Sequence, residues 1–325
     1  MSGFPNRGAV VALLVIAAAA CRPGLPPGGG GSGSGGGGST TTGPTWAGCS
    51  VFPADNAWNT DISRVAVRSD SAAIIAEIQG SGGHYLHADF GGGGAYGIPF
   101  VTVASTQTKY PINYTAYGSE SDPGPFPIPG SAPVEGGAAS TGDRHVIAVQ
   151  RGACRLYELY RAFWRSGHWD ADSGATWSLT SNAVRPAGFT SADAAGLPIF
   201  PGLARYDETT AGAIHHALRV TFSRTRRGYV YPARHFASSS IDPTRPAMGM
   251  RLRLKANFDV TRFHGEARVI LVALQHYGLI VADNGSNWYI TGASDSRWND
   301  TDLNQLKTVP GSAFEIVNTG PLTTG

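Results

Sequence analysis

Ionisable side chains are scarce in this chain, so the places where they gather are informative. Only 15 % of the 325 residues are charged, against about 25 % in a typical soluble domain. One such place is a predicted hairpin of residues 145–150 and 154–160. Strand pairing puts Glu158 beside Ile147, and alternation puts it on one face with Tyr160. A carboxylate among aromatic side chains is typical of acid/base catalysis on a glycan, whereas an ion pair with a nearby arginine would make Glu158 structural.

A second concentration of charge lies between residues 193 and 219. It contains three carboxylates, two histidines and two arginines: Asp193, Asp207, Glu208, His215, His216, Arg205 and Arg219. A carboxylate beside a histidine and an arginine could supply the general base and the substrate clamp of a hydrolase or lyase. The alternative is a loop held by ion pairs, with Asp193 as a helix cap.

These patterns predict a set of catalytic and substrate-binding side chains. The expected acid/base residues are Glu158, Asp207, Glu208, His145, His215 and His235. The expected substrate contacts are Arg205, Arg234, Tyr206, Trp169 and Trp288. Aromatic faces stack against sugar rings while polar neighbours bind the hydroxyls, so we expect a carbohydrate ligand. The alternative for each aromatic residue is a place in the core.

No metal and no cofactor are expected. His84, His87 and Asp89 have a spacing that metal ligands could use, but the glycines on both sides indicate a loop of solvated polar residues. The chain has no HExxH motif, which argues against a zinc protease. Residues 45–325 have no G-x-S-x-G motif, which argues against an α/β-hydrolase.

The amino terminus predicts export. Residues 8–20 carry no polar side chain but are too few to span a bilayer, which takes about 20 apolar residues. We therefore interpret residues 1–20 as a signal peptide. The Ala-Ala-Ala-Cys sequence that ends at Cys21 resembles the lipobox of bacterial lipoproteins, which implies that Cys21 is lipidated; ordinary cleavage would leave it unmodified. Residues 21–44 are a flexible tether rich in Gly and Ser.

The balance of charges indicates which partners to expect, and the cysteines indicate the cellular compartment. With 25 Lys and Arg against 23 Asp and Glu, the chain has no basic excess to neutralise phosphates, so nucleic acid is not an expected partner. Contact with a membrane is expected only through the lipid anchor. In an oxidising compartment Cys49 and Cys154 would form a disulfide, although two free buried thiols are the alternative. We expect a cell-envelope lipoprotein or an extracellular protein.

The elements that must position these residues are mainly strands. The chain has 44 Gly and 21 Pro, which favours strands and turns over a helical bundle. Further strands are predicted at residues 217–222 paired with 228–232, at 250–255, and at 279–282 paired with 287–291 about an Asn-Gly turn. Helices are predicted at residues 71–79 and 266–277, with one short turn at 191–195. Residues 45–325 are therefore expected to form a single jelly-roll-like β-sandwich with two or three peripheral helices.

Several longer segments resemble an uncharacterised family of secreted bacterial proteins. They are residues 124–137, 142–149, 156–160, 191–208, 231–240 and 282–293. The resemblance implies that residues 45–325 are one unit, and it implies no reaction or ligand.

These observations favour a secreted or surface-tethered enzyme that acts on an extracellular polysaccharide. We expect a glycoside hydrolase or a polysaccharide lyase that uses carboxylate and histidine acid/base chemistry. A glycan-binding or surface-binding lipoprotein without catalytic activity is the alternative, and a metal-dependent oxidoreductase that uses some of the 9 histidines is a third.

Overall fold

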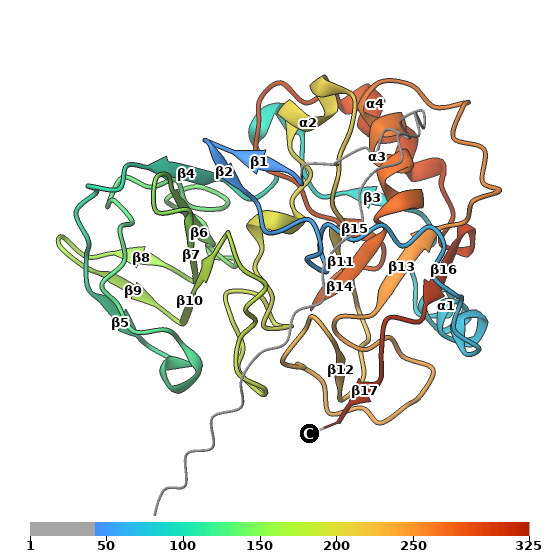
Figure 1. Cartoon of the computed structure of the whole chain (residues 1–325), viewed down its shortest axis with the longest axis horizontal. Helices are drawn as coiled ribbons and strands as arrows, with labels where there is room; N and C mark the ends of the chain where they lie inside the picture. The colour runs from blue at the N-terminus through green and yellow to red at the C-terminus, as the bar shows by residue number, and fades with distance from the viewer. Residues whose placement is uncertain (1–42, 325) are drawn as a thin grey trace, which may run out of the picture. The chain divides into compact units, whose positions relative to one another are not determined.

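Two large mixed sheets organise the fold, and each contains both parallel and antiparallel pairs (Figure 1). The computed structural model describes residues 43–324. The four-stranded sheet has the order β10 (Ser173–Ser178), β7 (Arg155–Tyr160), β6 (Val146–Gln150) and β4 (Phe100–Val103). The six-stranded sheet has the order β16 (Phe314–Val317), β13 (Arg251–Leu254), β14 (Leu279–Asn284), β11 (Leu218–Phe222), β15 (Tyr289–Ile290) and β3 (His87–Ala88).

Three smaller sheets complete the strands of the described residues. They are β1 (Thr45–Trp46) with β2 (Cys49–Ser50), β12 (Tyr229–Val230) with β17 (Leu322–Thr323), and β5 (Ile112–Tyr114) with β9 (Trp169–Ala171) and β8 (Phe163–Trp164). The mostly β class is therefore confirmed. A single jelly-roll-like sandwich is not confirmed, because the strands divide between separate sheets and the six-stranded sheet curls into a half-barrel.

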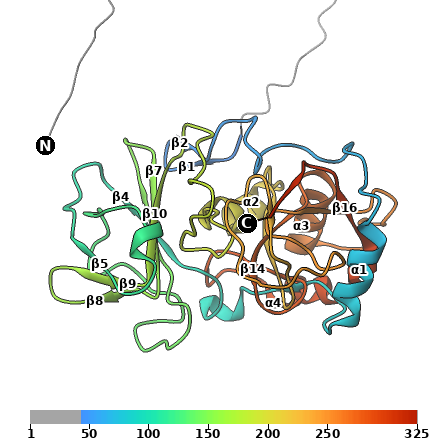
Figure 2. The same ribbon diagram turned by 90° about the horizontal axis from the view of Figure 1, so that it is seen from below.

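Four α-helices lie within residues 43–324 (Figures 1 and 2). They are α1 (Ser71–Gly80), α2 (Tyr206–Ala211), α3 (Gly265–His276) and α4 (Asp300–Asn304). Of these, α1 contacts β16, α3 contacts β13, and α2 and α4 contact α3. Short 3₁₀ turns are η1 (Gly92–Gly94), η2 (Gly118–Glu120), η3 (Phe200–Gly202), η4 (Gln305–Thr308) and η5 (Gly311–Ala313).

The two longer helices are confirmed at α1 and α3. In α3, Ala267, Ile270, Leu271 and Leu274 are buried with the spacing of one helix face, which packs against β13. Residues 191–195 form no helix. The sequence did not predict α2 and α4, because each is too short to develop a clear periodic pattern.

The hairpin of β6 and β7 has the predicted register, with Ile147 opposite Glu158. Both faces of this hairpin are buried. Ile147 and Leu156 belong to the larger hydrophobic core, whereas Val146 and Leu159 belong to a second core that also contains Trp169. Alternating residues of the same strands therefore serve two cores, which explains the near-continuous apolar character of these strands.

Two predicted strand pairs are wrong. Strands β14 and β15 do not pair with each other, because β11 lies between them and pairs parallel with β14 and antiparallel with β15. Strand β12 does not pair with β11 and instead pairs with β17 near the carboxyl terminus. Local turn signals favoured neighbours in the sequence, whereas burial of both faces of β11 favoured a central position in the sheet.

The predicted disulfide is confirmed between Cys49 and Cys154, which lie 105 positions apart with their Cα atoms 5.4 Å from each other. It links β2 to the turn that precedes β7. Cys21, the predicted signal peptide and nearly all of the predicted tether lie outside the described residues. No helix within residues 43–324 combines the length and the apolar character needed to cross a bilayer.

Candidate functional site

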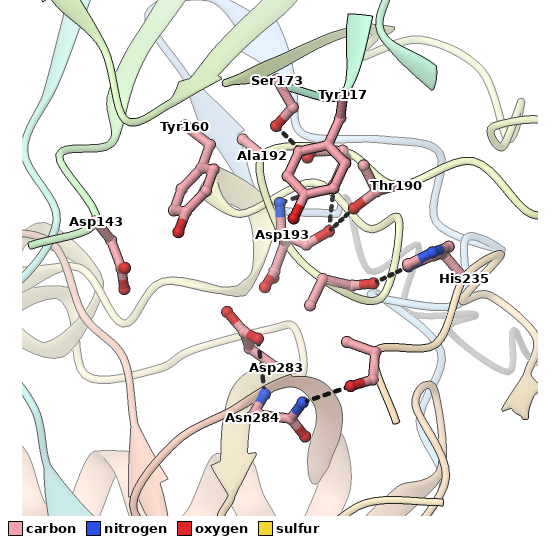
Figure 3. A pocket seen from close by; sticks show the side chains of 13 residues that line it. Tyr117, Asp143, Tyr160, Ser173, Thr190, Ala192, Asp193, His235, Asp283 and Asn284 are labelled. Atoms are coloured by element: carbon pink, nitrogen blue, oxygen red, sulfur yellow. Dashed lines mark hydrogen bonds between the residues drawn. The ribbon is translucent and has the colours of Figure 1, made fainter. Parts of the chain in front are cut away.

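A polar cavity of about 300 Å³ lies where the carboxyl end of β14 meets the end of β7 and the start of β10 (Figure 3). Its lining comes from segments far apart in the sequence: Tyr117, Asp143, Tyr160, Ser173, Thr190, Ser191, Ala192, Asp193, Ala194, His235, Ala237, Asp283 and Asn284. The lining contains three aspartates and no lysine or arginine. Its volume is at the lower end of the range for small-molecule sites.

A β-bulge brings Asp283 to this cavity. In the parallel pair of β11 and β14, Val220 is opposite Val281 and Thr221 is opposite Asp283, so Ala282 has no partner in β11. The Ala282 carbonyl instead accepts a hydrogen bond of 3.0 Å from the Ala195 N–H. Bulges redirect the side chains that follow them, and this one joins the strand to the loop on the other side of the cavity.

That loop, residues 190–196, is called the pocket loop below. The Ser191 hydroxyl donates to the Leu197 carbonyl at 2.6 Å and accepts from the Asp193 N–H at 2.9 Å. Gly196 has a φ of 68°, which favours glycine. These local bonds bend the loop tightly, so its side chains and carbonyls hold fixed directions toward the cavity.

Asp193 holds a negative charge at the base of the cavity. Both of its carboxylate oxygens accept hydrogen bonds from Arg219, at 2.7 Å from Nη2 and 3.0 Å from Nε. The remaining Arg219 nitrogen, Nη1, donates to the Thr291 hydroxyl at 2.7 Å. Burial lowers the pKa of Arg219, but the charge and hydrogen bonds of Asp193 outweigh it and raise that pKa. The pair is therefore a fixed, buried ion pair.

Asp283 lies beside this ion pair and is the titratable group of the cavity. Its Oδ2 is 3.9 Å from Nη2 of Arg219, and its Oδ1 accepts the Asn284 N–H at 2.7 Å. Its side chain is 27 % exposed. Burial and the nearby charge of Asp193 raise the pKa of Asp283 to about 7, against the opposing charge of Arg219. Near neutral pH this carboxyl can therefore both give and take a proton.

Behind the pocket loop, His145 makes two hydrogen bonds that both require it to donate. Its Nδ1 is 2.6 Å from Oε2 of Glu135, and its Nε2 is 3.0 Å from the carbonyl oxygen of Ala192. Both partners only accept, so both ring nitrogens carry hydrogen and the ring is a cation. Burial lowers the pKa of His145, but the charge and hydrogen bond of Glu135 outweigh it and raise the pKa to about 9. The Glu135 pKa, which burial would raise, is lowered by His145.

Two tyrosines and a histidine complete the polar lining. In Figure 3 the hydroxyls of Tyr117 and Tyr160 point into the space that Asp193 and Asp283 also face. The pKa of Tyr160 is raised by burial and by the charge of Asp143. His235 Nδ1 lies 2.7 Å from the Ala194 carbonyl oxygen, which can only accept. Its Nδ1 therefore carries the hydrogen, and Nε2 is left as an acceptor in the neutral ring.

Of the residues predicted from the sequence, His235 lines the cavity and His145 lies directly behind it. Glu158 is fully buried and does not line it. Its Oε1 accepts the N–H groups of Ile199 and Phe200 at 3.0 and 2.8 Å. Burial raises the pKa of Glu158 to about 7, although these N–H groups lower it. Backbone N–H groups therefore hold the carboxyl, and no arginine within residues 43–324 pairs with it.

The other predicted residues lie away from the cavity. Glu208 forms a buried network with Arg205 and His216, the latter at 3.1 Å. The pKa of Asp207, on the same helix, is raised by burial. The remaining residues have other surroundings: Tyr206 contacts Trp298, His215 contacts Tyr277, Arg234 donates to the Arg185 carbonyl, and Trp169 and Trp288 are core residues.

Asp283 and Asp143 were not predicted as site residues, and Asp193 was predicted only as a member of the charged cluster, with a helix cap as the alternative. A signal for Asp283 was present, since it directly follows the apolar run 279–282, where a buried strand ends. Within residues 43–324, no three His, Cys, Asp or Glu side chains are arranged to hold a metal ion. No model of a protein family, no curated protein and no solved structure matches this chain.

Proposed function

We propose that this protein is a glycoside hydrolase whose catalytic cavity is the one lined by Asp143, Asp193 and Asp283. The observation that carries the proposal is the environment of Asp283, a partly exposed carboxyl with a pKa of about 7 that faces a sugar-sized cavity. Glycoside hydrolysis needs two carboxyl groups in different protonation states. We assign the proton donor to Asp283 and the second carboxyl to Asp143, which lines the same cavity.

In the proposed reaction, Asp283 donates its proton to the glycosidic oxygen as the bond from that oxygen to the anomeric carbon breaks. The Asp143 carboxylate either takes a proton from the attacking water or itself bonds to the anomeric carbon and is then released by water. The anomeric configuration of the product distinguishes these two routes. Asp193 cannot take this role because Arg219 binds both of its oxygens; its charge instead raises the pKa of Asp283.

The lining also favours a hydrolase over a polysaccharide lyase. Lyases that cleave uronic acid polymers must bind and neutralise a substrate carboxylate, which cationic side chains do well. The cavity is lined by no arginine or lysine, so it offers no cationic side chain to bind the carboxylate of an anionic sugar. We therefore propose a neutral or amine-bearing sugar as the substrate. Export and lipid anchoring, predicted from residues 1–44, would place this activity outside the cell.

The test is a comparison of Asp283→Asn with Asp207→Asn on a polysaccharide panel. Asp207 is a suitable control because it is also an aspartate with a raised pKa, but it is exposed and does not line the cavity. Release of reducing ends by Asp283→Asn should fall by about 10² to 10⁴-fold, with binding retained, whereas Asp207→Asn should retain turnover. In the unsubstituted protein, kcat should fall as the pH rises through about 7, because Asp283 must be protonated.

The alternative outcomes are distinct. Full turnover by Asp283→Asn would refute the assignment of the proton donor. Products that absorb as unsaturated sugars would indicate a lyase. Binding to a polysaccharide without release of any product would favour the non-catalytic glycan-binding protein.

A further inference from the structure

A second cavity, of about 260 Å³, lies beside β3 and shares no lining residue with the first. It is bounded by the glycine-rich segment of residues 91–96 and by the consecutive turns α4 and η4. The lining residues that carry the argument are His87, Gly92, Tyr96, Asp300, Asn304 and Lys307. The proposed catalysis uses none of these residues.

Tyr96 forms an aromatic surface in this cavity. At 64 % it is the most exposed tyrosine within residues 43–324. Its ring packs directly on Gly92: a Cβ atom at Gly92 would lie 2.6 and 2.8 Å from the ring carbons Cδ2 and Cε2. Gly92 also has a φ of 58°. A glycine at position 92 therefore supports one side of the ring and leaves the rest free for a ligand.

Hydrogen-bonding groups lie along one side of the cavity. Asp300, Asn304 and Lys307 recur at intervals of four and three residues, so they lie on one face of α4 and η4. One oxygen of Asp300, Oδ1, accepts the Gly92 N–H at 2.8 Å. Within residues 43–324, neither the Asn304 amide nor the Lys307 ammonium group makes a hydrogen bond or ion pair. These donors and acceptors are therefore available to a ligand.

The charges of the cavity match a neutral ligand. Lys307 is positive and Asp300 is negative, so neither an anion nor a cation is favoured overall. His87 stacks on Tyr289 with ring centroids 4.2 Å apart. Burial and the charge of Lys307 lower the pKa of His87, so near neutral pH this ring is an uncharged donor and acceptor. An aromatic surface flanked by uncharged and balanced polar groups is suited to the apolar face and the hydroxyls of a sugar ring.

We propose that this cavity is a second saccharide-binding site, which holds a neutral sugar unit on the Tyr96 ring, separate from the catalytic cavity. The proposal rests on a glycan as the ligand class but not on the catalytic assignment. Such a site would keep a long polysaccharide on the protein while another part of the polymer occupies the first cavity, because two linked contacts bind more tightly than either alone.

The test is affinity electrophoresis of the full chain in native gels that contain xylan, glucomannan, mixed-linkage β-glucan or glycol chitin. Tyr96→Ala should weaken retardation by at least one of these polymers about tenfold, the effect of losing one ring contact of about 1.4 kcal/mol. Tyr85→Ala is the matched control, because Tyr85 is 53 % exposed and does not line this cavity. Gly92→Ala should weaken binding as well, since it displaces the ring while keeping Tyr96.

Two readouts, retardation and turnover, distinguish an error in this second site from an error in the proposed catalytic site. Asp283→Asn should lose turnover and keep retardation, whereas Tyr96→Ala should lose retardation and keep turnover of a short soluble oligosaccharide. Thermal unfolding checks that Tyr96→Ala and Gly92→Ala are folded. Equal retardation of Tyr96→Ala and the unsubstituted protein, or no retardation of the unsubstituted protein by any of these polymers, would overturn the second site.

Discussion

Replacement of Glu135 by Gln should convert His145 from a cation to a neutral ring. The substitution keeps the size of the side chain, but it removes the negative charge and the charged hydrogen bond that raise the pKa of His145. Burial, which lowers that pKa, is retained. The charge of Asp143 raises the His145 pKa and that of Arg219 lowers it, and both of these also remain. We therefore expect the pKa to fall from about 9 to below the ordinary value of 6.5.

The size of the effect follows from linkage. A pKa raised from 6.5 to about 9 corresponds to about 3 kcal/mol of stability, at about 1.4 kcal/mol per pH unit. Because the folded-state pKa is the higher one, this contribution is fully present below pH 6.5 and is lost as the pH rises through about 9. In Glu135→Gln the contribution should be absent, so the free energy of unfolding should depend less on pH between 6.5 and 10.

Two measurements check this expectation. NMR titration of the histidine Cε1–H signals follows the ring itself, and the His145 signal is assigned by its loss in His145→Gln. Urea unfolding at several pH values measures the linked stability. Asp61→Asn is the control, since its partner His276 is 51 % exposed, and an exposed pair 3.0 Å apart should contribute little. If His145 titrates below pH 7 in the unsubstituted protein, or if Glu135→Gln leaves its titration unchanged, the reasoning is refuted.

Two further predictions concern stability. Joint replacement of Cys49 and Cys154 by Ala should lower the free energy of unfolding by up to about 4–5 kcal/mol, because the disulfide closes a loop between residues 105 positions apart; an unchanged urea midpoint would contradict this. Glu158→Gln should preserve the fold because an amide oxygen still accepts the N–H groups of Ile199 and Phe200, whereas Glu158→Ala leaves them unpaired and should cost about 1–3 kcal/mol. Stability linked to Glu158 is present below pH 4.5 and lost as the pH rises through about 7, so Glu158→Gln should also flatten the pH dependence there. Equal thermal destabilisation by the two substitutions would refute this account.

The sequence was sufficient for features that depend on local pattern. The register of the β6–β7 hairpin follows from alternation about a glycine-containing turn, and α3 follows from its apolar spacing and the glycine after it. The disulfide follows from the number of cysteines and the expected compartment. The sheet order could not be predicted in this way, because β11 is paired with strands that lie far along the chain, and no local signal specifies such partners.

The candidate site was predicted only in part for the same reason. His235 and His145 were selected for their chemistry, but the carboxyl that they accompany comes from β14 and could not be matched to them before the fold was known. Density of charge was also misleading at α2. There Arg205, Glu208 and His216 balance one another inside the protein. A cluster of charges in a sequence therefore does not distinguish mutual neutralisation from a group kept ready for a ligand.

Ala282 illustrates how a regular sheet and an irregular cavity can share one strand. Up to Val281, β14 follows β11 residue by residue, and beyond Ala282 it is offset by one position. This offset divides the strand into a part that pairs regularly in the core and a short end at the cavity. Residues before it are buried in the core, whereas Asp283 beyond it faces the cavity. A change of side chain at position 283 would therefore alter the chemistry of the cavity while the pairing of the residues before Ala282 stays the same.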